Sequence, residues 1–161
     1  MKRVKLDAID LKILTELQND GRITNVDLAE RVGISAPPCL RRVRALEKAG
    51  LIQGYHADLD GRALGFEVTV FAMVGLHSQA EADLKSFEAL VGSWPLVREC
   101  HMLNGDIDFI LKCVAPDLST FQSFLTEKLT PAPNVASVRT SLTIRQSKHL
   151  PGVPLEALEE E

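Results

Sequence analysis

The 161-residue sequence has few cysteines, few aromatic residues and no long hydrophobic segment. Its three cysteines, Cys39, Cys100 and Cys113, are an odd number without a CxxC pair. That pattern is typical of a reducing compartment and argues against a disulfide framework or a structural zinc site. The longest mostly apolar run, residues 68–76, is far shorter than the roughly 18 residues that cross a bilayer. No apolar core follows the basic N-terminus, so we expect no secretory signal and a cytosolic protein.

The net charge of −4 conceals an asymmetry along the chain. Residues 1–60 contain ten Lys and Arg against nine Asp and Glu, whereas the remainder contains eight against thirteen. Residues 35–50 are the most basic stretch, with four cationic side chains and Glu47 as the sole acid. A local basic surface on an acidic protein is compatible with DNA binding, because attraction to phosphates acts over about a Debye length.

Three helices are predicted in the first 60 residues. Residues 7–19 place apolar side chains at helical spacing, a second helix runs from Thr24 to Gly33, and a third covers residues 36–49. The turn between the second and third helices is short and contains glycine. Two helices joined by such a turn, the second of them basic, indicate a helix-turn-helix. Residues 51–59 predict one or two short strands, which would form a wing.

The third helix carries the candidate DNA-binding residues. The spacing predicts that Leu40, Val43 and Leu46 are buried, which places basic side chains on the outward side. The two prolines after Ser35 have no N–H, so we expect its hydroxyl to make no helix cap and to be free for a phosphate. Arginine suits both guanine pairing and phosphate contact. The candidates are Ser35, Pro37, Arg41, Arg42, Arg44 and Lys48.

The second part of the chain has a different element order. After a linker at 61–66, residues 67–147 predict strand 67–76, helix 80–91, strand 96–103, strand 107–114, helix 117–129 and strand 135–145. This βαββαβ order is that of a ferredoxin-like αβ-sandwich, so the predicted fold class is α+β, with a winged helix-turn-helix in residues 1–60. The Asn104-Gly105 pair predicts a tight hairpin turn. Residues 148–161 are expected to form a loosely held acidic tail.

One face of this sheet is expected to need a partner. Two helices can cover only one face of a four-stranded sheet. The first strand is nevertheless apolar on both sides, and the third carries Ile110 on its second side. We therefore predict that a second subunit covers this face, with the wing or the tail as the alternative cover. A dimer also suits a helix-turn-helix that reads two half-sites.

Two separate stretches resemble the leucine-responsive regulatory protein/AsnC family, the feast/famine regulators: ITNVDLAERVGISAPPCLRRVRALEKAGLIQGYHADLD and LNGDIDFIL. The resemblance spans both domains, from about Asp7 to Ser147. It implies a sequence-specific transcription regulator of the bacterial or archaeal cytosol, associated with the nucleoid, whose DNA binding or assembly responds to an amino acid. It also implies dimers that often close into octamers. The family commonly has a hydroxyl residue at the DNA-binding position of Pro37, so we expect one contact fewer there and a different base preference.

The effector site is expected at the hairpin of the second motif. Backbone amides would suit an amino-acid carboxylate, and Asp106 and Asp108 its ammonium group; the alternative is an ordinary turn with solvated acids. In the family pattern the last strand also lines the pocket, with ligands held between subunits. The candidate effector residues are Leu103, Asn104, Gly105, Asp106, Asp108, Ser141 and Thr143.

Other classes of function fit the sequence less well. It contains no nucleophile and base at a recognisable spacing, no phosphate-binding glycine loop and no metal motif, so neither an enzyme nor a cofactor is expected. A metal- or redox-sensing repressor would use Cys100, His101 and Cys113. However, adjacent strand residues such as Cys100 and His101 point to opposite faces. An effector-free DNA-binding co-regulator of the same architecture stays open as an alternative.

Overall fold

The computed structural model describes residues 5–158 and divides into two compact units. The first unit contains the described residues up to Asp58 together with those from Lys148 onward, and the second is Leu59–Ser147. Residues 1–4 and 159–161, which belong to the predicted DNA-binding domain and tail, lie outside the described residues. Among the residues described, no helix is long and apolar enough to cross a membrane.

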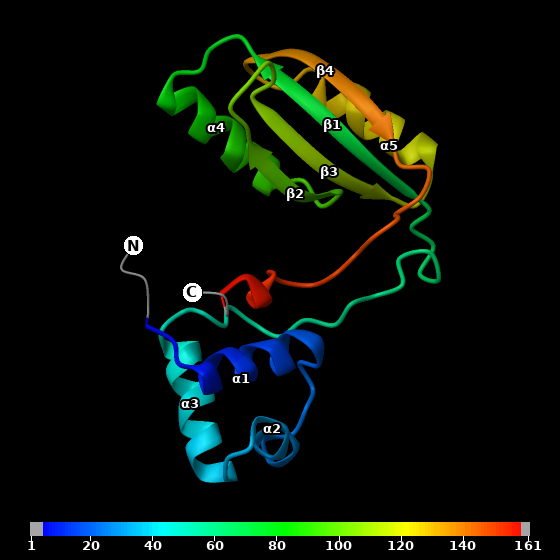
Figure 1. Cartoon of the computed structure of the whole chain (residues 1–161). Helices are drawn as coiled ribbons and strands as arrows, with labels where there is room; N and C mark the ends of the chain where they lie inside the picture. The colour runs from blue at the N-terminus through cyan, green and yellow to red at the C-terminus, as the bar shows by residue number, and fades with distance from the viewer. Residues whose placement is uncertain (1–4, 159–161) are drawn as a thin grey trace. The chain divides into compact units, whose positions relative to one another are not determined.

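Three short helices form the first unit, as predicted: α1 (Ala8–Asn19), α2 (Asn25–Val32) and α3 (Ala36–Lys48) (Figure 1). Local chemistry sets their ends. The Asp7 side chain caps α1, and the Thr24 hydroxyl accepts a hydrogen bond from the backbone of α2. Gly33 ends α2 at φ 79°, a left-handed conformation that glycine adopts without steric cost. The turn between α2 and α3 is therefore tight, as a helix-turn-helix requires.

The side of α3 that faces the core differs from the prediction by one residue. Cys39 is fully buried beside Ile13, and Leu46 is 4% exposed, whereas Leu40 is 37% exposed. The prediction that Leu40 lies in the core is therefore wrong. Cys39 and Leu46 are seven residues apart and so lie on one side of the helix, with the half-buried Val43 beside them. Leu40 is rotated by about 100° from Cys39, which turns it outward.

The wing predicted for residues 51–59 forms no strand in the described structure. The segment forms no ladder with another described segment, and a strand requires a partner. Tyr55 attaches it to α3 by donating a hydrogen bond from its hydroxyl to Glu47 at 3.0 Å. Burial and this hydrogen bond raise the pKa of Tyr55 to about 12.

The C-terminal segment packs on the first unit, so the expectation of a loosely held tail is corrected. The Gln18 side chain donates to the carbonyl of Val153 and accepts from its N–H, both at 2.9 Å. Leu155, in the 3₁₀-helix Leu155–Leu158, is 8% exposed. Gly152 has φ 70°, and a Cβ atom there would collide with the Gln18 side chain. Close backbone approach and one buried leucine hold this segment in place.

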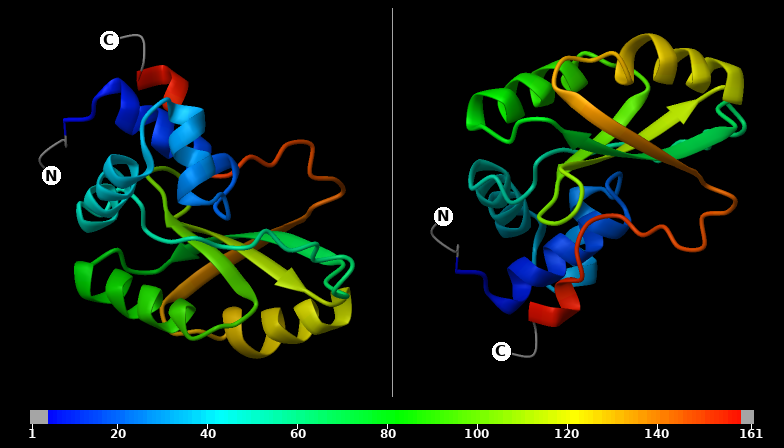
Figure 2. Two further views of the ribbon diagram at one scale, coloured as in Figure 1. Left: turned by 90° about the horizontal axis from the view of Figure 1, so that it is seen from below. Right: turned by 90° about the horizontal axis from the view of Figure 1, so that it is seen from above.

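The second unit has the predicted βαββαβ order. Its elements are β1 (Val68–Leu76), α4 (Glu81–Gly92), β2 (Val97–Met102), β3 (Phe109–Ala115), α5 (Leu118–Phe124) with the π-helical turn Leu125–Leu129, and β4 (Val135–Leu142). The strands form one antiparallel sheet in the order β2-β3-β1-β4. Figure 2 shows α4 and α5 on the same face of this sheet. β4 ends three residues before the predicted end at Arg145.

The two faces of the sheet have different surroundings. On the helix side, alternate residues of β1 and β3 are buried around Phe109, which packs against Phe87 of α4 at 4.9 Å between ring centroids. On the other side, Phe71, Met73 and Ile110 are only partly buried, because neither helix of the unit covers them. We call Phe71, Met73 and Ile110 the open sheet face. The sequence correctly predicted that β1 is apolar on both sides.

Candidate DNA-binding surface and effector site

The start of α3 is held by α2 rather than by its own cap. Ser35 occupies the N-cap position, and its hydroxyl makes no capping hydrogen bond, as the prolines that follow predict. The side-chain amide of Asn25, the first residue of α2, donates to the carbonyl of Ala36 at 2.9 Å. Pro37 is exposed. Asn25 thus fixes the start of α3 to α2, and the Ser35 hydroxyl is not used in a cap.

A single outward stripe of α3 carries most of the predicted DNA contacts. We define the outward stripe as five exposed residues of α3: Pro37, Leu40, Arg41, Arg44 and Lys48. Because successive helical residues are rotated by about 100°, the side chains of all five point within about 60° of the direction of Pro37. Within residues 5–158, no carboxylate forms an ion pair with a cation of this stripe. Three cations are therefore available to phosphates or base edges.

Arg42, also predicted to contact DNA, is engaged inside the unit. Its Nη1 lies 2.7 Å from Asp7 Oδ2 and 2.7 Å from Asp10 Oδ1 at the start of α1. Arg42 follows Cys39 by three residues and therefore lies toward the buried side of α3. A backbone hydrogen bond from Asp10 and the Arg42 guanidinium hold the pKa of Asp7 below its usual value. In this structure Arg42 thus joins α3 to the start of α1, and its predicted contact with DNA stays a prediction.

We expect Arg42→Met to lower the melting temperature at pH 7 by about 2–4 °C. The pKa of Asp7 is lowered in the folded state. The ionised Asp7 therefore stabilises the fold above its ordinary pKa, and this stabilisation is lost as pH falls through the lowered pKa. The difference in melting temperature between Arg42→Met and the wild type should therefore shrink at pH 3 and below. Arg41→Met, on the outward stripe, is the matched control and should leave the melting temperature unchanged. A pH-independent deficit would contradict the pairing with Asp7.

The effector hairpin is wider than the sequence predicted. The N–H of Leu103 donates to the carbonyl of Asp108 at 2.8 Å and closes a loop between β2 and β3. Gly105 has φ 153°, but Asn104 has no positive φ. The prediction of a tight two-residue turn at Asn104-Gly105 is therefore wrong, because such a turn requires positive φ at both positions. Residues 103–106 are exposed at the loop.

The two acids of this hairpin have different environments. Asp108 Oδ2 accepts a hydrogen bond from the N–H of Leu76 at 2.7 Å, and the Asp108 N–H donates to Val74 at 3.0 Å. Both bonds attach the hairpin to β1 beside the irregularity at Gly75 and Leu76. Asp106 is exposed and forms no hydrogen bond with another described side chain. The Asp108 carboxylate therefore ties the loop to β1, whereas Asp106 faces solvent.

Ser141 and Thr143 lie at the opposite end of β1 from this hairpin. Ser141 pairs with Phe71, and the N–H of Thr143 donates to the carbonyl of Thr69 at 2.8 Å. From Thr69 to Leu76 the strand rises about 23 Å at 3.3 Å per residue. The structure therefore does not bring the two halves of the predicted effector set together within one subunit.

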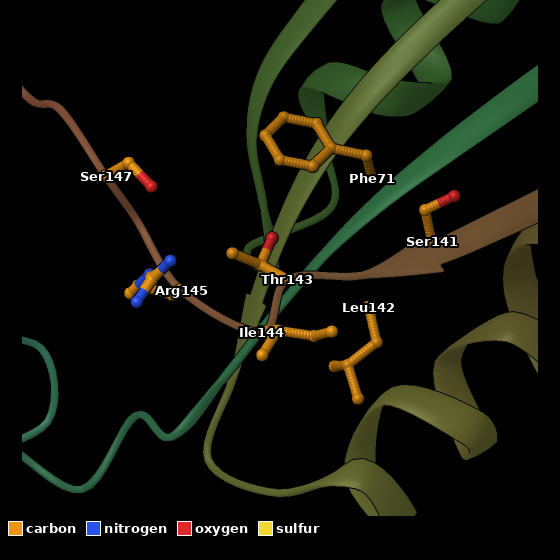
Figure 3. A pocket seen from close by; sticks show the side chains of 7 residues that line it. All are labelled: Phe71, Ser141, Leu142, Thr143, Ile144, Arg145 and Ser147. Carbon is orange, nitrogen blue, oxygen red and sulfur yellow. The ribbon is translucent and has the colours of Figure 1, made fainter.

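A shallow hollow of about 640 Å³ lies beside Ser141 and Thr143 (Figure 3). Its lining residues are Phe71, Ser141, Leu142, Thr143, Ile144, Arg145 and Ser147. The Thr143 Oγ1 atom is buried without a hydrogen-bond partner among the described residues. Sequence reasoning missed Phe71 and Arg145 here, because only the pairing of β1 with β4 makes them neighbours.

The residues of the metal-sensing alternative do not converge. Cys113 lies in the core, where burial raises the pKa of its thiol to about 11. His101 lies on the opposite face of the sheet, with Nε2 3.4 Å from Glu99 Oε2. Among the residues that the structure describes, no three His, Cys, Asp or Glu side chains are grouped to hold a metal ion.

Comparison with known proteins assigns both units. Residues 6–53 match the winged helix-turn-helix DNA-binding family, and residues 69–153 match the Lrp/AsnC ligand binding domain. A leucine-responsive regulatory protein of Rhizobium meliloti is 64% identical over 146 residues, which cover 91% of this chain and 94% of that protein. One from Salmonella typhimurium is 43% identical over 143 residues, which cover 89% and 87% of the two chains.

The fold of this chain matches a solved structure over nearly the whole length of both chains. The transcriptional regulator of Neisseria meningitidis in complex with L-Met has a TM-score of 0.91 and 36% identity, covering 96% of this chain and 99% of that one. These matches confirm the α+β fold and the regulatory, non-enzymatic function that the sequence predicted. A helix-turn-helix with a cationic outward stripe, joined to a ligand-binding αβ-sandwich, places this chain in the Lrp/AsnC family of DNA-binding transcription regulators.

Proposed function

We propose that this protein reads operator DNA with α3, as a dimer or a larger assembly, and that a bound amino acid changes its assembly or DNA affinity. The observation that carries the proposal is the outward stripe, whose cations Arg41, Arg44 and Lys48 form no ion pair within residues 5–158. The exposed Ser35 hydroxyl adds a phosphate contact. The operator lies on the chromosome, so the place of action is the bacterial or archaeal cytosol, at the nucleoid.

An amino acid is the effector that best fits the hairpin. The exposed loop offers the Asp106 carboxylate for an ammonium group and backbone amides around Gly105 for a carboxylate. The Neisseria meningitidis regulator, with the same fold, is a complex with L-Met, which supports an amino-acid ligand here. Because Ser141 and Thr143 lie at the far end of β1, they contribute to this site from a neighbouring subunit.

The proposed dimer interface is the open sheet face. Phe71, Met73 and Ile110 form a partly buried apolar surface that no helix of their unit covers. Lys112 and Glu99 lie on the same face and neutralise each other at 2.7 Å. An apolar surface with a paired charge at its side suits a second copy of the same chain. The family resemblance extends this dimer to an octamer.

Met73→Glu tests the interface. A glutamate in the middle of an apolar contact has no partner for its charge, so we expect the dissociation constant of the dimer to rise at least about 100-fold. Sedimentation at micromolar concentration measures this change. Leu118→Glu, on the exposed side of α5, is the matched control and should leave assembly unchanged. A folded Met73→Glu variant that sediments like the wild type would show that subunits meet elsewhere.

A thermal-shift screen of the twenty amino acids, followed by DNA binding with and without the best hit, tests the proposed function. At 100 times its dissociation constant, a ligand of the folded state should raise the melting temperature by about 5–10 °C. A shift for one or a few amino acids, with a matching change in DNA affinity, is the expected result. DNA binding without any shift would favour the effector-free co-regulator.

A further inference from the structure

Besides Pro37, the outward stripe contains an exposed leucine among its cations. Leu40 is 37% exposed, although it lies between the buried Cys39 and the exposed Arg41. It shares the first half of the stripe with Pro37, whereas the second half is cationic. Pro37 and Leu40 are therefore the apolar end of the stripe, and the cations Arg41, Arg44 and Lys48 follow them along α3. In a recognition helix, the N-terminal residues are the ones that contact base edges.

The backbone of the first turn of α3, unlike the Ser35 hydroxyl, has few N–H groups left for a phosphate. A helix N-terminus usually binds anions through its free backbone N–H groups. Here Pro37 and Pro38 remove the N–H at the second and third helical positions. The N–H of Cys39 is already bonded to the Ser35 carbonyl at 3.2 Å. With two N–H groups removed by proline and the Cys39 N–H already bonded, this turn offers few backbone donors to a phosphate. The apolar surface of Pro37 and Leu40 therefore suits an apolar group in the groove.

We propose that Leu40 contacts the C5-methyl group of a thymine in the major groove and selects a T·A pair at one position of each half-site. The thymine methyl is the apolar group that the major groove presents, and apolar side chains read it by contact. This inference rests on the proposed binding of DNA by α3. It assigns a specificity-determining role to Leu40, beside the cations that supply affinity.

The test uses the full-length protein and removes the methyl group alone. A high-affinity duplex is first selected from random DNA with the wild-type protein, and each thymidine is then replaced by deoxyuridine. At one position in each half-site, we expect the loss of a buried methyl to weaken wild-type binding about fourfold. In Leu40→Ala the same replacement should have no effect, whereas Leu40→Met, which keeps an apolar group, should retain it. Leu51→Ala, similarly exposed at 40% but outside α3, is the matched control.

The outcomes separate this inference from the function on which it rests. Failure of the wild type to enrich any sequence would contradict sequence-specific DNA binding. Specific wild-type binding with an equal deoxyuridine effect in Leu40→Ala would overturn the role of Leu40 alone. If Leu51→Ala also abolished the deoxyuridine effect, the role of Leu40 would likewise be overturned, because the loss would then reflect a general change in protein stability. Circular dichroism establishes that each variant is folded.

Discussion

The variant with Arg41 and Arg44 both changed to alanine should bind operator DNA at least about 30-fold more weakly than the wild type, because each arginine contributes about 1–3 kcal/mol to base or phosphate contacts. Both side chains are exposed on the outward stripe, so the fold and the assembly should be preserved. For each lost phosphate contact, the slope of log affinity against log salt should fall by about 0.9. Fluorescence anisotropy across a salt series measures both quantities.

A control variant with the same change in net charge distinguishes direct arginine–DNA contacts from the general electrostatic attraction between protein and DNA. The double variant Arg22→Ala and Arg62→Ala also removes two exposed arginines, neither of them on α3. We expect it to lose a few-fold in affinity at low salt and nothing at high salt, since exposed charges are screened beyond a Debye length. If both double variants lose affinity equally, or if Arg41 and Arg44 prove dispensable, another surface must read the DNA.

Asp106→Asn should weaken binding of the effector amino acid by about 10–150-fold, because a hydrogen bond to a charged group contributes about 1.5–3 kcal/mol. Asp106 is the sharper target of the two hairpin acids, since the Asp108 carboxylate already accepts the N–H of Leu76. Asparagine keeps the shape and removes the charge that pairs with an ammonium group. Isothermal titration of the best amino acid from the screen measures the loss.

Asp108→Asn serves as the matched comparison. Its side-chain oxygen still reaches the Leu76 N–H, but the bond is no longer charge-assisted, so we expect a lower melting temperature as its main effect. Neither variant should change DNA affinity in the absence of ligand, because both residues lie in the second unit. Ligand-dependent changes in assembly or DNA affinity should be lost in Asp106→Asn. Equal amino-acid affinities of Asp106→Asn and wild type would exclude Asp106 from the site.

The errors of sequence interpretation have a common physical cause, which is that local pattern does not fix long-range contact. On α3, Leu40 and Cys39 are both apolar, and periodicity alone allowed either to face the core. Packing against the neighbouring helices buries Cys39. The same orientation of α3 turns Arg42 toward Asp7 and Asp10. The expected wing likewise required a partner strand, and residues 51–59 pair with none in the described structure.

The sequence by itself determined what depends on neighbouring residues. Thr24 and Gly33 set the ends of α2, and the alternation of β1 predicted two apolar faces, because caps and side-chain alternation are local properties of the backbone. Tertiary structure decided which residues meet. The strand register separated Ser141 from the effector hairpin by most of β1 and gave Asp108 its bond to Leu76. Such pairings join residues tens of positions apart, and only the packing of the whole sheet selects among them.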